Sequence, residues 1–461
     1  MKPQLLVFAV LTAFACAAAA DGGPRDEVDS VPRQAAFGRA VMETTPAAAA
    51  PGLGRLVAMA PDQAEPQSAA AVLTVEMAVS AATGNHPQLQ AARAAVRRQQ
   101  HLVFQATRRP NPTVGYVASE VGNDADAGQQ GVFLSQEEVR GDKLTLDGHV
   151  RYKEVLLQQE QLRLEQLQIE ADVRYACIEV AYAQEQLKLL QRLQQSLDTA
   201  VSAVTTLVQS GELGSSAALQ SRLEAQRNLM KTRQTAAALQ TAQQSLAAVI
   251  GWKSFAAAVD NRILRPDSSD DSSAMGHWDR IRNNSPQLAI VRAQQQIARA
   301  RVCREKAEPI PNLQTQWSLQ QDAATDYTVL GIQLGVELPI RDRNRGAISA
   351  AEADTWRFHH RAEAVERELR TRYVNLSGQA EQAQLQLTTI KDQLEGLALQ
   401  NVSTTQQAFR LGEATYLDLL NAQRAYISLS LETLDLYRRL SIIDAACDTL
   451  LVQPPAGRLG R

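Results

Sequence analysis

The sequence of 461 residues has few aromatic residues, few cysteines and almost no long apolar segments, and each scarcity excludes a class of protein. Aromatic side chains make up 5% of the chain, and alanine, glutamine and leucine dominate its middle, which favours long helices over a thick globular core. The four cysteines stand singly, so neither a disulfide framework nor a zinc site is expected. A net charge of −3 gives no electrostatic basis for binding nucleic acid.

The N-terminus has the pattern of a secretory signal peptide over residues 1–20. Lys2 supplies the positive charge, Leu5 to Ala15 form a short apolar stretch, and small residues precede a cleavage point near Asp21. Cys16 leaves open a second possibility, acylation as a lipoprotein, although the residues before it fit that cleavage site poorly.

Beyond the signal, no segment contains about 18 consecutive apolar residues, so no transmembrane helix is predicted. Residues 21–68 are rich in alanine, proline, glycine and aspartate and have no periodicity, which predicts a disordered leader. Residues 454–461 are similar and are predicted to form a disordered tail.

The most informative feature that is present is a duplication. The segment Asn85-His86-Pro87-Gln88-Leu89 recurs 199 positions later as Asn284-Ser285-Pro286-Gln287-Leu288, and Gly211-Glu212 recurs 201 positions later as Gly412-Glu413. The offset between matching residues thus changes by only two positions, which predicts two copies of one unit, at residues 69–270 and 271–453. Each copy reads as helix, proline break, two strands, long helix, tight turn and helix. Solenoid repeats are excluded, because their units have only ~20–50 residues.

Each copy contains one stretch that suits a very long helix. No proline or glycine lies between Gly148 and Gly211, and the stretch from Gly346 to Gly412 contains only two further glycines. A helix of ~65 residues would be ~100 Å long. Apolar residues recur in both stretches in alternating steps of four and three, with Gln194 as a polar exception, a period that predicts supercoiling against partner helices. The predicted seam positions are Ile169, Val173, Ala176, Val180, Ala183, Leu187, Leu190, Gln194, Leu197, Val201, Val204 and Val208, then Leu376, Ala380, Ala383, Leu387, Ile390, Leu394, Leu397, Asn401, Thr404 and Ala408.

Each long helix is predicted to end at a glycine turn, because glycine tolerates the left-handed conformation that closes a helix. Apolar periodicity resumes after both turns, so each copy should carry a helical hairpin. The turn residues Gly211, Glu212, Leu411, Gly412 and Glu413 are predicted to contact another protein. The alternative is a plain connection between helices that has no partner.

Four shorter segments have the pattern of β-strands, with partial alternation of apolar and polar residues. They are Thr113–Val121, Gly131–Val139, Asn312–Gln320 and Val329–Leu338. Each is ~9–10 residues long, which suits a tilted strand that crosses a bilayer. Four aromatic residues, Tyr116, Phe133, Trp317 and Tyr327, are suited to membrane interfaces. Two small hairpins in a soluble α+β domain remain an alternative. Four strands cannot close a barrel within one chain, which favours a ring of several chains.

In these features the chain resembles the TolC-like outer-membrane efflux family, over about residues 73–452. The segments that carry the resemblance are Leu73 to Ala78, the two Asn-X-Pro motifs, Pro110-Asn111-Pro112, Leu338-Pro339-Ile340 leading into Arg343 to Gly346, and Arg410 to Ala414 followed by Leu419 to Gln423. Each is weak alone, but their order and duplicated spacing are specific. The segment from Pro339 to Gly346 looks most like the metal- and drug-efflux branches. Arg140 to Lys143 depart from the Gly-Lys-Arg-like turn that is common in the family.

The resemblance implies a mainly α-helical fold with four membrane β-strands, assembled as a homotrimer into an α/β barrel duct. It also implies an outer-membrane location extending into the periplasm. The expected partners are a periplasmic adaptor (membrane fusion) protein at the hairpin tips, an inner-membrane pump and outer-membrane lipid. The duct would export small molecules or metal ions. Its periplasmic gate is expected near the tips, with Asp418 as the candidate; a surface acid near a helix start is the alternative for this residue.

No enzyme, resident cofactor or metal site is expected. The six histidines are scattered, and the adjacent pair His359 and His360 would point ~100° apart on a helix. Two other classes remain open, a periplasmic adaptor and a structural coiled coil. The first would have one hairpin rather than two, and the second leaves the strand pairs without a role.

Overall fold

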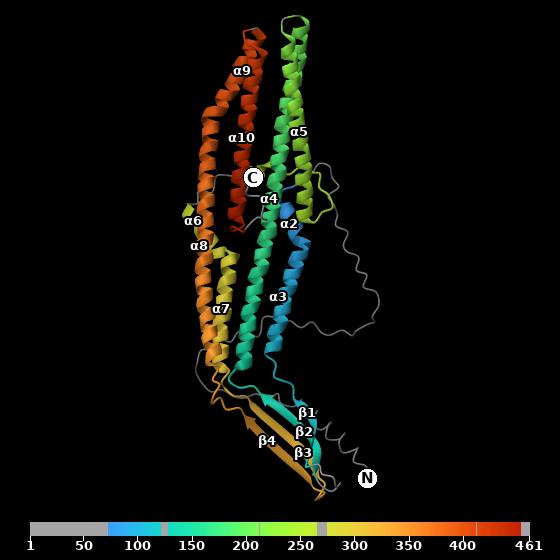
Figure 1. Cartoon of the computed structure of the whole chain (residues 1–461), viewed down its shortest axis with the longest axis vertical. Helices are drawn as coiled ribbons and strands as arrows, with labels where there is room; N and C mark the ends of the chain where they lie inside the picture. The colour runs from blue at the N-terminus through green and yellow to red at the C-terminus, as the bar shows by residue number, and fades with distance from the viewer. Residues whose placement is uncertain (1–71, 121–127, 212, 265–273, 412, 453–461) are drawn as a thin grey trace, which may run out of the picture. The chain divides into compact units, whose positions relative to one another are not determined.

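The computed structural model describes residues 72–120, 128–211, 213–264, 274–411 and 413–452 (Figure 1). The predicted signal peptide, leader and tail lie outside these ranges, as do Cys16, Glu212 and Gly412. None of the helices in these ranges has both the length and the apolar character that crossing a membrane requires.

The elements follow the predicted order in both halves of the chain (Figure 1). In the first half they are α2 (Val75–Asn85), α3 (Pro87–Ala106), β1 (Thr113–Ser119), β2 (Gln129–Glu138), α4 (Lys143–Gln209), α5 (Ser215–Ile250) and a 3-10 turn (Asn261–Leu264). In the second half they are α6 (Ala274–Asn284), α7 (Pro286–Ala307), β3 (Leu313–Asp322), β4 (Thr328–Val336), α8 (Arg345–Thr389), a π-helical turn (Ile390–Leu394), α9 (Glu395–Leu411) and α10 (Tyr416–Asp448).

The two Asn-X-Pro motifs start helices. Helix α3 begins at Pro87 and α7 at Pro286, and the residues before them, His86 and Ser285, have extended backbones. Proline lacks an N–H and has a fixed φ, which suits the first helical position, and it forces the preceding residue out of the helical region. The predicted proline breaks are confirmed.

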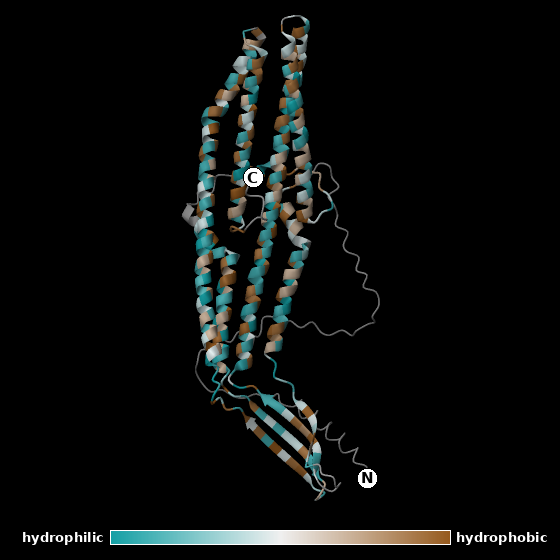
Figure 2. Cartoon of the chain, in the orientation of Figure 1, coloured by the Kyte–Doolittle hydropathy of each residue, from teal (hydrophilic) through white to brown (hydrophobic). Residues whose placement is uncertain are grey.

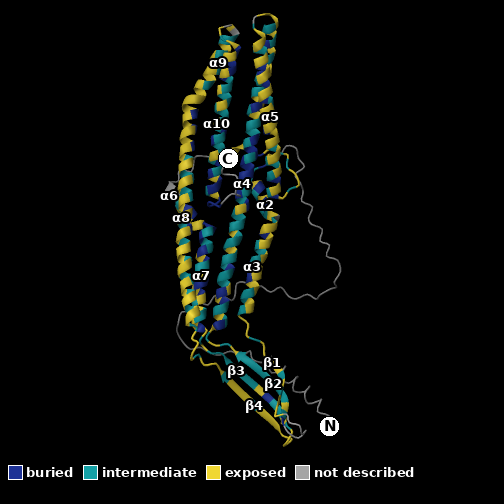
Figure 3. Cartoon of the chain, viewed as in Figure 1, coloured by how far each residue is buried: buried dark blue, intermediate teal, exposed yellow. Residues whose placement is uncertain are grey.

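Helix α4 is the central helix, and its predicted seam faces the protein. It packs against α5, α3, α7, α10 and α2. Every predicted seam position from Ile169 to Val208 is buried or half-buried, and Figure 3 shows the dark stripe along this helix. The largest core cluster gathers around Val173, Ile178 and Val180. At 67 residues, α4 is about 100 Å long.

The polar exception in the seam has a partner. Asn228 of α5 is buried and donates from Nδ2 to the Oε1 atom of Gln194, 2.8 Å away, and to the carbonyl oxygen of Leu190, 3.1 Å away. A polar pair within an apolar seam fixes the register of two helices, since slippage would leave its groups unpaired.

Replacing Asn228 by alanine is therefore expected to lower the free energy of unfolding by about 1–3 kcal/mol. Both hydrogen bonds are lost, and the Oε1 atom of the half-buried Gln194 loses the donor that Asn228 supplies. Thermal unfolding of purified protein, followed by circular dichroism, measures the change. Gln226→Ala, at an exposed position on the same helix, is the control. Equal stability of the two variants would contradict the register role.

The predicted seam of the second long helix fails from Leu394 to Thr404, although its last position, Ala408, is half-buried. Ala383, Leu387 and Ile390 are buried, but Leu394 and Leu397 are 43% and 64% exposed. The π-helical turn Ile390–Leu394 is the cause, because it adds one residue to a turn and rotates the following helix. Ala398, Val402 and Thr405, each one residue beyond a predicted position, are half-buried instead. The prediction for Leu394, Leu397, Asn401 and Thr404 is wrong.

The four strands form one antiparallel sheet in the order β1-β2-β3-β4 (Figure 1). The predicted strands are confirmed, with ends shifted by a few residues. The pairing of β2 with β3 joins the two halves of the chain, with Leu134 opposite Trp317. Within the described residues, the outer edges of β1 and β4 have no partner strand.

Candidate functional site

The sheet has one apolar face. The antiparallel register places four residues in each of two rows across the strands, Val114, Leu134, Trp317 and Ile332 in one row and Tyr116, Val132, Leu319 and Leu330 in the next. Thr315 with Leu334 and Leu313 with Val336 extend this face. On β4 the side chains of Leu330, Ile332 and Leu334 are all exposed, and Figure 2 shows the alternating colours of the strands. An exposed apolar surface of this kind indicates contact with a membrane or another protein.

The opposite face is more polar and rich in glycine, although Val117 and Val329 also lie on it. It carries Ser318, Gln316, Gln320 and Gln333, and none of the four strands contains a lysine or arginine. Phe133 belongs to this face and covers Gly115, where a Cβ atom would come within 2.6 Å of the phenylalanine ring. Phe133 therefore leaves the sheet on the opposite side from Tyr116 and Trp317. A place for these aromatic residues at membrane interfaces stays a prediction.

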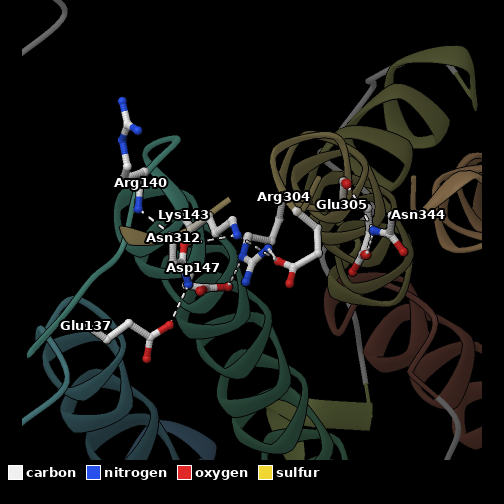
Figure 4. Close-up of polar contacts among 9 residues, drawn as sticks. Glu137, Arg140, Lys143, Asp147, Arg304, Glu305, Asn312 and Asn344 are labelled. Carbon is white, nitrogen blue, oxygen red and sulfur yellow. Dashed lines mark hydrogen bonds and ion pairs between the residues drawn. The ribbon is translucent and has the colours of Figure 1, made fainter. Parts of the chain in front are cut away.

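A polar network fixes the base of the sheet to the helices (Figure 4). Asn312, just before β3, donates to Glu137 of β2 at 2.7 Å and accepts from the ammonium group of Lys143 at 3.2 Å. Lys143 is buried at the start of α4. Arg304 of α7 pairs with Asp147 of α4 at 2.7 Å. These contacts connect the two halves of the chain where strands become helices.

The two hairpin turns close in the same way. In the first turn, Gly211 has a φ of +81°, and the N–H of Leu213 donates to the carbonyl of Leu207. In the second turn, Ala414 donates to Ala408. In both bonds the acceptor lies six residues before the donor. The donor and the acceptor of the second turn each lie 201 positions after those of the first. Leu411 is exposed, as is Glu413, so the described residues of the tips are open to a partner.

Asp418 lies at the start of α10, where it closes a capping box with Thr415. Its carboxylate accepts from the backbone N–H of Thr415 at 2.9 Å and from the hydroxyl at 2.6 Å. These bonds favour the charged form and hold the pKa of the carboxyl below its usual range. The spacing Thr-X-X-Asp is itself a capping signal that sequence reasoning overlooked.

The two hairpins contact each other below their tips. Arg424 of α10 forms an ion pair with Glu224 of α5, which also pairs with Arg227 at 3.2 Å. Tyr416 and Leu420 of α10 pack there against an apolar cluster whose other buried members are Leu197, Val204 and Ala225. Sequence reasoning missed this contact, because the two charges are 200 residues apart.

No metal centre is formed by the residues that the structure describes, since no three metal-binding side chains are arranged to hold an ion. His359 and His360 both lie near Glu363 on the exposed side of α8, at 3.6 and 3.3 Å. Cys177 is buried, Cys447 is half-buried and Cys303 is exposed.

Comparison with known proteins identifies this architecture. Residues 278–451 match the outer membrane efflux protein family. Over 363 residues the chain is 25% identical to the cobalt-zinc-cadmium resistance protein CzcC of Cupriavidus metallidurans, covering 78% of this chain and 85% of the relative.

Solved structures show the same fold. CusC has a TM-score of 0.68 at 15% identity, covering 82% of this chain and 91% of that one. VceC of Vibrio cholerae has a TM-score of 0.65 at 16% identity, covering 82% and 96%. The resemblance to the TolC-like outer-membrane efflux family is confirmed, and so is the mainly helical fold with four strands.

Proposed function

We propose that this chain is a TolC-like outer-membrane efflux protein and forms the exit duct of a tripartite efflux system, carrying its cargo from a periplasmic adaptor and an inner-membrane pump to the exterior. The observation that carries the proposal is the family match over residues 278–451, joined to a sheet with one exposed apolar face. We also propose that the chain contains two repeats of this family's unit, at residues 69–270 and 271–453.

The duct is a homotrimer. In it the free edge of β4 in one chain pairs with the free edge of β1 in the next, so that twelve strands close a barrel with the apolar face toward lipid. The unpaired edges and the amphipathic sheet support this assembly, since an exposed sheet edge is a template for a further strand.

The hairpin tips dock the adaptor. Gly211, Leu411 and Glu413 are the described members of this surface, and Glu212 and Gly412 complete it. Two exposed turns with matching hydrogen bonds support a repeated contact by one kind of partner.

The gate is formed by the contact between the hairpins, where Glu224 meets Arg424. Asp418 remains a candidate for lining the constriction, although its capping bonds give it a structural role as well. Separation of the hairpins near their tips would break the ion pair between Glu224 and Arg424 and uncover the apolar cluster around Leu420. The ion pair between Arg438 of α10 and Glu179 of α4 lies further along the helices.

Replacing Arg424 by alanine is accordingly expected to raise the conductance of the purified protein in planar lipid bilayers, because the hairpins lose the ion pair near their tips while Glu224 keeps Arg227. The matched control is Arg439→Ala, on the same helix, whose partner Asp435 belongs to that helix. Unchanged conductance in Arg424→Ala would show that this contact is not part of the gate.

The proposed cargo is a metal cation. Two observations support it, the named role of CzcC in cobalt, zinc and cadmium resistance and the absence of lysine and arginine from the four strands. Cells that lack the chain should become sensitive to Co²⁺, Zn²⁺ or Cd²⁺ and regain resistance with the wild-type gene. Unchanged metal resistance with sensitivity to organic toxicants would favour export of small molecules instead.

Transport rather than catalysis fits the relatives, whose names describe efflux and resistance. A periplasmic adaptor or a structural coiled coil is the alternative function. Both are less favoured, because neither explains two hairpins joined to a single sheet with an apolar face.

A further inference from the structure

The segment between β4 and α8 carries three arginines around one hollow. This segment, residues 338–346, is called the arginine loop below. Arg341, Arg343 and Arg345 line a hollow of about 380 Å³ together with Ile340, Asp342 and Gly346. The guanidinium groups of these arginines make no ion pair or hydrogen bond with the described part of the chain. Three unpaired positive charges are thus gathered in a small, open volume.

The surroundings do not neutralise this charge. Among the described residues that line the hollow, Asp342 is the only acid, and its carboxylate accepts a 2.9 Å hydrogen bond from the backbone N–H of Asn344. Arg345 is the first residue of α8, where the helix dipole disfavours positive charge. The side chain of Asn344 is directed to Glu305 and does not cap the helix. A bound anion would relieve both the repulsion among the arginines and the conflict with the dipole.

In the corresponding segment of the first repeat, the positive charge at the start of the long helix is paired with other residues of the chain. There Lys143, the first residue of α4, is buried and donates to Asn312 at 3.2 Å, as Figure 4 shows. It lies 3.9 Å from Glu308 as well. The two junctions therefore differ at the residue that starts the long helix, since Lys143 is paired within the chain whereas the guanidinium of Arg345 has no partner among the described residues.

Apolar side chains stand beside the three arginines. Leu338 and Ile340 are each 71% exposed, and they follow the exposed row of Leu330, Ile332 and Leu334 on β4. A surface that changes from exposed aliphatic to unpaired basic within a few residues has the pattern of a membrane–water boundary. Arginine suits phosphate in particular, because its planar fork donates two parallel hydrogen bonds.

We propose that the arginine loop binds the phosphate headgroups of anionic phospholipids in the periplasmic leaflet of the outer membrane, with Leu338 and Ile340 among the acyl chains. The inference rests on the proposed function, because it takes the apolar face of the sheet as the lipid-facing one. It adds a lipid site at the junction of the sheet and the helices, placed only at the second repeat.

The test measures lipid binding to the detergent-purified full chain by native mass spectrometry, with phosphatidylglycerol, phosphatidylcholine and inorganic phosphate as probes. The wild type should retain phosphatidylglycerol in preference to phosphatidylcholine. The triple variant Arg341→Gln/Arg343→Gln/Arg345→Gln should bind phosphatidylglycerol about tenfold more weakly or worse, given the attraction of each basic residue to anionic lipid. The control Arg222→Gln/Lys231→Gln/Arg233→Gln removes the same charge from exposed positions on α5 and should bind like the wild type.

Three results would overturn the proposal. Equal phosphatidylglycerol binding by the triple variant and the wild type would remove the site. Displacement of phosphatidylglycerol by an equal concentration of inorganic phosphate would make the site one for free phosphate. Loss of the oligomer in the triple variant, with lipid binding per chain unchanged, would assign the arginines to a contact between copies. Membrane fractionation separates these failures from a failure of the proposed function, because only the latter removes the wild type from the outer membrane.

Discussion

Replacement of Ile332 by arginine is expected to remove the protein from the outer membrane. Ile332 lies at the middle of β4 on the apolar face, and its side chain is exposed on the described chain. A charged residue on the lipid face of a membrane sheet costs about 2–4 kcal/mol near the bilayer midplane. The proposed trimer would bear this cost three times. Fractionation of cell membranes followed by immunoblotting measures the loss.

The neighbouring residue supplies the control. Gln333 follows Ile332 on the same strand but belongs to the polar face, opposite Gln316. Gln333→Arg should therefore reach the outer membrane in normal amounts, since its charge would face water. If both variants insert equally well, the apolar face is not the lipid-facing one.

Replacement of Gly211 by valine is expected to abolish efflux while leaving the amount of protein in the membrane unchanged. The φ of +81° lies in the left-handed region, which a β-branched residue adopts only with strain. A Cβ atom at this position meets nothing within 4 Å, so the damage is confined to the turn. We expect the same from Gly412→Val at the second tip, outside the described residues. Metal resistance of cells that produce each variant, with its membrane level measured in parallel, is the readout.

Gly378→Val separates this effect from a general intolerance of valine. Gly378 lies within α8, and a Cβ atom there also has open space. This variant should keep wild-type resistance. Wild-type resistance in Gly211→Val as well would remove the first tip from the docking surface.

Local features of the chain could be predicted because their causes are local. Pro87 and Pro286 start helices through their fixed φ, and glycine closes the first hairpin turn through its freedom at positive φ. The seam of α4 could be read from its period, since α4 is a single uninterrupted helix.

Other features depend on contacts that no local pattern encodes. The π-helical turn at Ile390 shifts the seam by one residue, although no proline or glycine stands within it to signal the change. The face occupied by Phe133 depends on a pairing with β1 in which Gly115 leaves room for its ring. The ion pair between Glu224 and Arg424 requires the two hairpins to be brought together first.

The central claim is that this chain forms a trimeric duct in the outer membrane. The most direct test is the mass of the species extracted from isolated membranes with mild detergent, corrected for bound detergent. We predict about three chain masses, found in the outer-membrane fraction. A monomer or dimer that dissolves in water without detergent would contradict the account and favour a periplasmic coiled-coil protein.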